Sequence, residues 1–552
     1  MAPRKLTALS LAMLVHSSFQ FDLDFFDLDM CPDYTLYSSY THQPYSLGPL
    51  GLSFQRPHES CRTFHSDAIE TVISDVTSRM KDVDLARLFE NAFPSTTDTT
   101  VKFHTNGSDS TAARIAAAAK AKAKSAKKTT QNPLTHGDGK WEGAQSFIIT
   151  GDIIAEWLRD STNQLSPYQP LAKKDRGVYN LILGAINTQS EYVIASPYCN
   201  AFQPPPISGL RPSENGQGDN VHPAYEPSTV FECKYELDSL AHFLALANEF
   251  HLHTGSTDYL TPRWYRALAT VLRVLEQQSQ PTFDPATGQF VRNEYTFQRD
   301  TNTGTETLNL AGVGNPLNNG TGLIRSAFRP SDDATILGFF IPANAMIAVE
   351  LKRTAAVLAK VEGKEALSKA VAAWSQAITD GVWKHGVVKH REFGDVFAYE
   401  VDGYGSHILM DDANYPSLLA LPLMGFVPAT DPTYQNTRRM LLSKKSNPYY
   451  LTGRQFKGIG GPHIGLQNAW PMSLLIQAQT SEDDAEILDC LNLVLTTARL
   501  GLIHESIDVN NMYSYTRSWF AWANGVFAET ILDLAKRKPH LIFKSPAKPY
   551  EM

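Results

Sequence analysis

The feature that most constrains this chain is a helical period of apolar residues that continues through most of it. Apolar side chains recur at three- and four-residue steps, the spacing of one face of an α-helix. The first stripe follows Ser66, a residue type that caps helix N-termini. The stripes occupy residues 69–83, 178–186, 237–250, 260–275, 345–358, 367–382, 472–478, 487–500 and 520–534. With shorter candidates they predict roughly a dozen helices.

Strand signals are sparse. Residues 387–401 alternate around a glycine turn, and residues 289–297 follow an Asp-Pro turn, so both segments predict hairpins. The alternation of strands and helices that builds a doubly wound sheet is missing. We therefore predict an all-α fold with a few short β-hairpins. Periodicity alone does not separate a toroid of paired helices from a solenoid, although the chain has no internal repeat.

Length and charge narrow the function classes. At about 150 residues per domain, 552 residues would suggest three or four domains, but no Pro/Gly/Ser-rich linker divides the chain. The net charge of −8 argues against nucleic acid as a partner, because phosphate binding needs a surplus of Lys and Arg. Past the N-terminus no segment reaches the ~18 apolar residues of a membrane span. The oligomeric state is not indicated.

Two segments stand apart from the helical pattern. Arg4 and Lys5 precede the mostly apolar residues 6–15, which favours a secretory signal within residues 1–18 over an ordinary N-terminal segment. Sequons at Asn106 and Asn319 agree with a secreted or secretory-pathway protein. Residues 111–130 are rich in Ala and Lys and have no apolar face, so a solvated insertion is favoured over a basic binding patch.

The cysteines do not form a metal-binding or redox motif. The chain has five Cys and no C-x-x-C pair, which makes a zinc knuckle or thioredoxin-type site improbable. Cys31 and Cys61 lie in an extended N-terminal region, and the sequence is compatible with either a disulfide between them or two free thiols. Cys490, within an apolar run, is predicted to be a buried thiol.

Common catalytic motifs are absent, and polar clusters rich in carboxylates and Trp remain. There is no G-x-S-x-G elbow, no H-E-x-x-H and no P-loop. The clusters lie at 157–161, 231–238, 328–333, 410–415, 461–471 and 503–506, at the ends of helical stretches. An N-cap for a helix at Ala334 is the structural alternative for Asp332.

Together these clusters indicate carbohydrate chemistry. A pyranose offers hydroxyls to charged and amide groups and an apolar face to aromatic rings. Glycosidic cleavage uses two carboxyl groups, one protonated and one ionised. Loops between helices around a toroid would bring such groups to one pocket.

At these residues the chain resembles glycoside hydrolase family 125, the metal-independent exo-acting α-1,6-mannosidases. The resemblance begins in the blocks that contain Cys31 and Cys61. It continues through WLRDS (157–161), FRPSDD (328–333), DDANYPSLLALP (411–422), GGPHIGLQNAWPM (460–472) and HES (504–506). It covers nearly the whole chain except the Ala/Lys insertion.

The resemblance implies an (α/α)6 barrel of about twelve helices and an inverting mechanism without cofactor or metal. It also implies a glycan substrate with a terminal mannose. The general base falls on Glu505. The acid falls on Asp332, with Asp333 as a close alternative, and its pKa is expected to be raised by burial or by the neighbouring carboxylate. Further candidates for the sugar pocket are Trp157, Arg159, Asp160, Asp411, Asp412, His463, Asn468 and Trp470.

The predicted layout is one catalytic domain with short flanking segments. A signal at 1–18 is followed by an N-terminal extension at 19–65 that packs on the barrel. The catalytic domain spans 66–540 with the insertion at 111–130, and the tail spans 541–552. The alternatives are a glycosidase of other linkage specificity, a non-catalytic carbohydrate-binding relative and an interaction scaffold.

Overall fold

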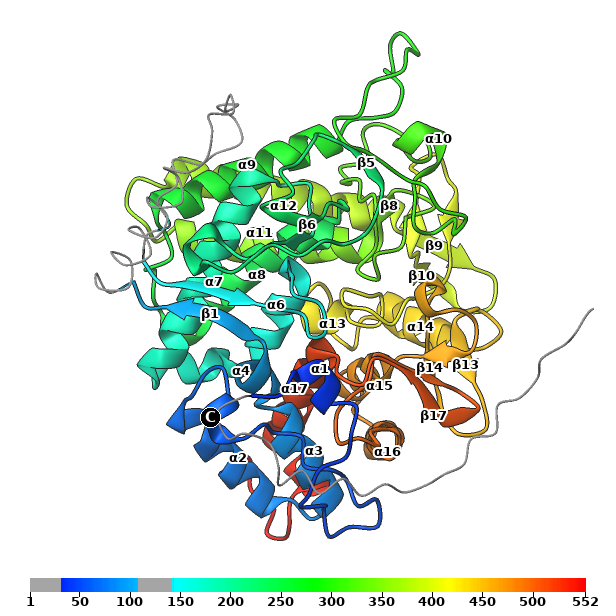
Figure 1. The fold of residues 1–552 in the computed structure, drawn as a ribbon. Helices are drawn as coiled ribbons and strands as arrows, with labels where there is room; N and C mark the ends of the chain where they lie inside the picture. The colour runs from blue at the N-terminus through cyan, green and yellow to red at the C-terminus, as the bar shows by residue number, and fades with distance from the viewer. Residues whose placement is uncertain (1–30, 108–140, 142) are drawn as a thin grey trace, which may run out of the picture.

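The computed structural model describes residues 31–107, 141 and 143–552 (Figure 1). The predicted signal segment and the Ala/Lys insertion lie outside these residues. In the described part, helices dominate, as the apolar period predicted.

Five helices form the buried centre of the molecule. Their side chains are buried on nearly all faces, as expected of helices that are covered on every side. They are α6 (Leu158–Leu165), α8 (Leu237–Thr254), α11 (Ile341–Leu358), α15 (Pro471–Gln479) and α17 (Ala521–Arg537). Helix α6 packs against α8 and α17, α8 also packs against α11, and α15 packs against α17. The short helix α13 (Leu421–Met424) packs against α11.

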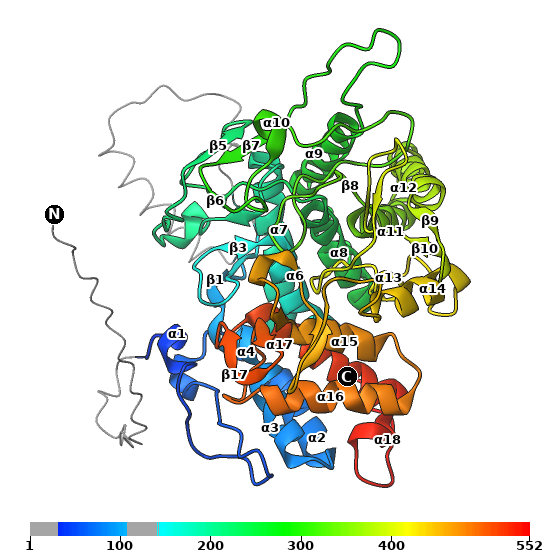
Figure 2. The ribbon, with the colours of Figure 1, turned by 90° about the vertical axis from the view of Figure 1, so that its right-hand side faces the viewer.

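Longer amphipathic helices cover this centre. Four of them follow a central helix in the sequence and α14 follows the short helix α13; each exposes one polar face, as in α9, whose buried positions repeat at helical spacing. They are α7 (Arg176–Ala195), α9 (Pro262–Gln278), α12 (Glu365–His385), α14 (Pro432–Leu441) and α16 (Asp484–Thr497). Figure 2 shows α12 and α16 on the outside of α11 and α15.

The ends of these helices carry the expected local signals. Ser66 caps α2 (Asp67–Arg79) by accepting a hydrogen bond from the Ile69 amide, which confirms the cap read from the sequence. Gly255 ends α8 in the left-handed conformation (φ 70°), where a side chain would be strained. The stripe at 69–83 is not one helix, since α3 (Val83–Ala92) begins after a break at Met80.

The described strands form seven small sheets of two or three strands, more β structure than expected. The hairpin at 387–401 is present as β9 (Val387–His390) with β10 (Gly394–Phe397). The hairpin expected at 289–297 is present only as one antiparallel β-bridge, Phe283–Phe290, across the Asp-Pro turn, and β7 (Thr296–Arg299) pairs instead with the distant β5 (Asp219–His222). The remaining strands are β1 (Val101–Thr105), β2 (Gln145–Ile148), β3 (Glu156–Trp157), β4 (Ala201–Phe202), β6 (Val230–Glu232), β8 (Phe339–Phe340), β11 (Glu400–Val401), β12 (His407–Ile408), β13 (Tyr450–Thr452), β14 (Lys457–Ile459), β15 (Asn468–Ala469), β16 (Ser506–Asp508) and β17 (Asn511–Thr516).

Several of these strands end immediately before a central helix. Strand β3 leads into α6, β8 leads into α11, and β15 is separated from α15 by Trp470 alone. A two-residue strand pairs with its neighbours and fixes where the helix begins. The N-termini of α6, α11 and α15 therefore have defined positions, and the candidate site residues Arg159 and Trp470 lie at two of them.

The two ends of the described chain meet. Helix α3 packs against α16 and α17, and Met80 forms a β-bridge with Phe543 beyond α18 (Pro539–Ile542). Figures 1 and 2 both show the blue N-terminal helices beside the red C-terminal ones. Gln55, in the N-terminal segment, donates a hydrogen bond from Nε2 to the Leu500 carbonyl (2.7 Å).

Two disulfides are formed. Cys31–Cys61 confirms the pairing that the sequence left open, and Cys490 is buried and free, as predicted. The second disulfide, Cys199–Cys233, was not predicted, because its cysteines lie in separate polar segments. None of the described helices is long and apolar enough to cross a membrane.

Candidate active site

A small pocket lies at the N-terminal ends of the central helices. Its walls come from α6 and α17, from Trp470 just before α15, and from the loops that carry Asp332 and Glu505. Seven of the sequence-predicted residues line it: Trp157, Arg159, Asp160, Asp332, His463, Trp470 and Glu505. Helix N-termini carry partial positive charge, which favours carboxylates at this end of the helices.

Arg159, in the first turn of α6, is the electrostatic centre of the pocket. Its guanidinium lies 2.5 Å from Asp160 Oδ2 and 3.1 Å from Asp332 Oδ1. On the side away from the pocket it contacts Glu236 Oε2 (3.1 Å) and Asp238 Oδ2 (3.5 Å). One buried cation thus contacts four carboxylates, and this network of ion pairs holds the site in one geometry.

Asp332 lies in the pocket wall with its side chain 25% exposed. Its backbone is left-handed (φ 66°), a strained conformation for a residue with a side chain and one that recurs at functional sites. No helix begins at Ala334, so the N-cap alternative is wrong; the next helix, α11, starts at Ile341. Lys234 Nζ donates a hydrogen bond to the Asp332 carbonyl (2.9 Å).

The expectation of a raised pKa at the acid is wrong for Asp332. Burial acts to raise its pKa, but the charges of Arg159 and Lys234 outweigh burial and hold the pKa below its ordinary value. The neighbouring Glu236 shows the opposite behaviour. Burial raises its pKa well above the ordinary value despite Arg159, and Asp332 adds to the rise.

Glu505 lies just before β16 and is held from a different direction. Arg517 donates from Nε to Glu505 Oε1 (3.2 Å) and pairs with Asp152 through Nη1. Glu505 is 6% exposed and lines the same pocket as Asp332. The preceding His504 stacks on Tyr515 at 3.8 Å, and burial lowers the pKa of His504 to about 4, so His504 is neutral and structural.

Aromatic rings form the rest of the wall. Trp157, Trp470, Phe520 and Trp522 line the pocket, and Arg159 lies over the Trp522 ring at 5.1 Å. The indole nitrogens of the three tryptophans have no hydrogen-bond partner in the described protein. These N–H groups are buried, and the aromatic rings give this part of the pocket an apolar wall.

Four predicted residues lie outside the pocket wall. Asp333 is 2% exposed at its side chain and lies 3.7 Å from His463 Nδ1. Asp411 is fully buried and accepts hydrogen bonds from the Leu418 and Leu419 amides, which is a structural role.

The other two residues support pocket residues from behind. Asp412 accepts a hydrogen bond from Asn414 Nδ2 (2.8 Å), and Asn414 lines the pocket. Asn468 donates a hydrogen bond to Ser506 Oγ (2.9 Å), next to Glu505.

Several residues of the site were not predicted from the sequence. Asn200, Lys234 and Glu236 surround Asp332, while Asp152 and Arg517 hold Glu505. Lys234 and Glu236 belong to the polar cluster at 231–238. The charged residues directly before an apolar helix are the sequence signal that could have identified them as site residues. Asn200 and Arg517 carry no comparable signal, because only the fold brings them to the site.

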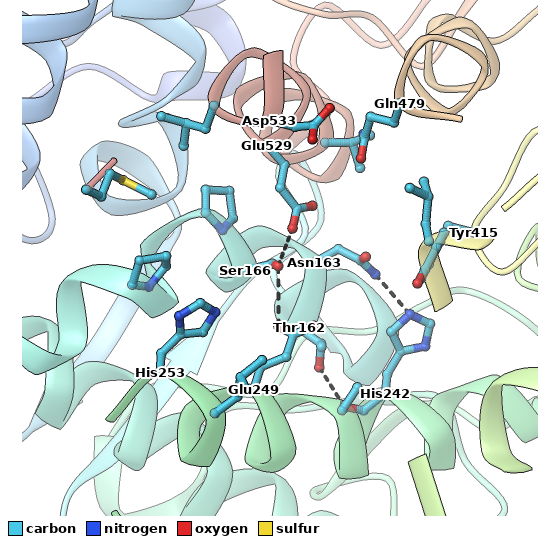
Figure 3. A pocket seen from close by; sticks show the side chains of 18 of the residues that line it. Thr162, Asn163, Ser166, His242, Glu249, His253, Tyr415, Gln479, Glu529 and Asp533 are labelled. Atoms are coloured by element: carbon cyan, nitrogen blue, oxygen red, sulfur yellow. Dashed lines mark hydrogen bonds between the residues drawn. The ribbon is translucent and has the colours of Figure 1, made fainter. Parts of the chain in front are cut away.

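A larger cavity, of about 560 Å³, lies between the C-terminal halves of the central helices (Figure 3). Ser166 bonds there to both Glu529 (2.6 Å) and Glu249 (3.3 Å). Size alone would favour this cavity, since the pocket at the helix N-termini measures only about 50 Å³. We assign the site to the smaller pocket, because it contains the two separately held carboxylates, the arginines and the aromatic wall.

Within the described residues, no group of three or more His, Cys, Asp or Glu side chains is arranged to hold a metal ion. The pocket instead presents carboxylates, arginines and aromatic rings. A helix-rich fold with two carboxyl groups in an aromatic-walled pocket defines the class: a glycoside hydrolase.

The comparisons with known proteins identify the family. The family profile described as metal-independent alpha-mannosidase (GH125) matches residues 82–532. The chain is 52% identical over 516 residues to the meiotically up-regulated gene 157 protein of Schizosaccharomyces pombe, with 93% of this chain and 94% of that protein covered. The chain belongs to the GH125 family of metal-independent alpha-mannosidases.

A solved structure agrees with this assignment. It is a metal-independent alpha mannosidase from Streptococcus pneumoniae in a non-productive substrate complex with α-1,6-mannobiose. It is 30% identical, with a TM-score of 0.71, and covers 85% of this chain and 99% of its own. The predicted family and helix-rich fold are thus confirmed.

Proposed function

We propose that this protein is an inverting exo-α-1,6-mannosidase that releases a terminal mannose from a glycan. The observation that carries the proposal is the pocket in which Asp332 and Glu505 are held by separate arginines. In the proposed reaction Asp332 protonates the glycosidic oxygen, and Glu505 removes a proton from the water that attacks C1.

The geometry supports Asp332 over Asp333 as the acid. Asp332 lines the pocket, whereas Asp333 is almost fully enclosed and faces His463. Arg517 contacts Glu505 Oε1 at 3.2 Å and so holds the side chain of the proposed base in one orientation at the pocket wall.

The size of the pocket supports exo action. At about 50 Å³ it is well below the ~300 Å³ of an ordinary ligand site, so a sugar ring would occupy the pocket and its mouth. The α-1,6 linkage is proposed from the mannobiose bound to the Streptococcus pneumoniae relative.

We further propose that the central and covering helices form an (α/α)6 barrel. The alternation of a buried helix with a covering helix along the chain supports this arrangement, as does the packing of α17 back against α6. For localisation we propose the secretory pathway. The two disulfides and the exposure of Asn106 and Asn319 support it.

Hydrolysis of α-1,6-mannobiose by the purified protein tests the proposal. Asp332→Asn and Glu505→Gln are each expected to lower kcat by at least about 10³-fold without loss of folding. Proton NMR of the first-formed mannose should show the β-anomer, the inverted product. A panel of other mannose and glucose disaccharides tests the linkage. Full activity of both variants, or the α-anomer as first product, contradicts the proposed mechanism.

A further inference from the structure

We propose that Glu236 shares a single proton with Asp332 and supplies it to that residue during catalysis. Glu236 does not line the pocket, so it acts through Asp332 as a positioning residue. The inference rests on the proposed role of Asp332 as general acid.

The two carboxylates are held by the same two nitrogen atoms. Asn200 Nδ2 donates to Glu236 Oε1 (3.0 Å) and to Asp332 Oδ1 (3.2 Å). Arg159 Nη2 lies 3.3 Å from the same Glu236 oxygen and 3.1 Å from the same Asp332 oxygen. Oxygens that share both donors lie next to each other, as in a carboxyl dyad.

The two groups differ in their access to solvent. The Glu236 side chain is fully buried, and the Asp332 side chain is 25% exposed toward the pocket. A proton held by the pair therefore has an inner position on Glu236 and an outer position on Asp332, where the substrate oxygen would arrive.

The surrounding charges oppose ionisation of both members together. Two cations, Arg159 and Lys234, face the pair, and His463 also faces Asp332. The other carboxylates in this cluster are Asp160, Asp238 and Glu232, and Glu232 is also paired with a third cation, Arg299 (2.8 Å). Because the carboxylates outnumber the cations in a buried region, one proton held on the pair lowers the electrostatic free energy. The raised pKa of Glu236 and the lowered pKa of Asp332 agree with this distribution.

The proton balance of the reaction follows. In the free enzyme the proton is on Glu236, and Asp332 is ionised. The proton moves from Glu236 to Asp332 as the substrate excludes water. It then moves from Asp332 to the glycosidic oxygen as the C1–O bond breaks. Water adds to C1 and leaves its proton on Glu505. The pair is then doubly ionised, and solvent must return one proton to it, while Glu505 loses one.

The pH profile of kcat/KM tests the proposal, because the alkaline limb reports the pKa of the proton-carrying pair. Glu236→Gln removes the inner site and leaves Asp332 between Arg159 and Lys234. We expect the alkaline limb for α-1,6-mannobiose to move down by about 1–2 pH units. An aryl α-mannoside whose leaving phenol needs no proton should lose little activity.

Ser239→Ala provides a matched variant with the opposite expectation. Ser239 Oγ donates to Glu236 Oε2 (3.0 Å), a hydrogen bond that stabilises the ionised carboxylate. Its loss should raise the pKa of the pair and move the alkaline limb up by about 1 pH unit. Glu236→Asp, which restores a carboxyl group, should return the limb toward the wild-type pH.

The outcomes separate this inference from the proposed function. Thermal melting checks that each variant folds, and Ser239→Ala alone decides the matter if Glu236→Gln does not fold. Unchanged alkaline limbs in the folded variants would overturn the shared proton. An equal loss of activity of Glu236→Gln on α-1,6-mannobiose and on the aryl α-mannoside would also overturn it, because such a loss indicates that Glu236 has a purely structural role. If Asp332→Asn itself keeps full activity on mannobiose, the acid assignment fails first, and the inference fails with it.

Discussion

Replacement of Arg159 by Met tests whether one buried cation holds the site together. Arg159 is 3% exposed at its side chain and contacts four carboxylates: Asp160, Glu236, Asp238 and Asp332. Removing one partner of a buried ion pair costs about 3–5 kcal/mol, because the remaining charge has no compensation. At about 2.1 cal/mol/K per residue, unfolding 552 residues carries roughly 1.2 kcal/mol/K of entropy. The expected fall in Tm is therefore about 3–4 K.

The pH dependence of this loss has a definite sign. Burial raises the pKa of Asp160 to about 6 and that of Asp238 to about 7, although Arg159 opposes the rise. Below pH 5 both groups hold their protons, so Arg159 compensates fewer charges and its removal matters less. Between pH 5 and 8 they ionise, and without Arg159 their ionisation carries the full desolvation cost. The gap in Tm between wild type and Arg159→Met should therefore widen from pH 5 to pH 8.

Differential scanning fluorimetry at pH 5, 6, 7 and 8 measures this gap. Arg439→Met is the matched control, since Arg439 is exposed and, within the described part of the chain, bonds only to the neutral amide of Asn436, so the Tm should change by less than about 1 K. A gap that is constant with pH, or that narrows as pH rises, would refute the reasoning. So would an Arg159→Met variant as stable as Arg439→Met.

Three further predictions concern other parts of the molecule. Burial raises the pKa of Glu156 from 4.5 to about 8, so ionisation disfavours the folded state increasingly from pH 4.5 to 8. Glu156→Gln should thus be more stable than wild type at pH 8, by at most about 5 kcal/mol, and no more stable at pH 4 in the same melting assay. Gly184 lets α7 approach β2, because a Cβ there would lie 2.3 Å from Ser146 Oγ, and Gly184→Ala should cost about 1–3 kcal/mol in denaturant titrations. Incubation with EDTA should leave the initial rate on α-1,6-mannobiose unchanged, and a dose-dependent loss that added metal restores would contradict metal-independent catalysis.

Short-range signals in the sequence were sufficient to predict the helices. The stripes at 178–186, 237–250 and 520–534 became α7, α8 and α17, because a helical period of apolar residues can be buried only as a helix. The strands were harder to predict. Many span two or three residues, too few to show alternation, and β7 pairs with a segment some 75 residues away in the chain.

The sequence by itself determined that the chain is helical and which segments carry carboxylates and tryptophans. Through its resemblance to a known family it also determined the family and the candidate residues Asp332 and Glu505. Tertiary structure decided which carboxylates face the pocket and which are structural, as for Asp411, whose oxygens accept backbone amides. It also decided that Glu236 and Asn200 lie beside Asp332, and that the charges of Arg159 and Lys234 hold the pKa of Asp332 below its ordinary value although burial acts to raise it. The physical reason is that burial and charge proximity depend on residues far apart in the chain, and sequence spacing does not record such distances.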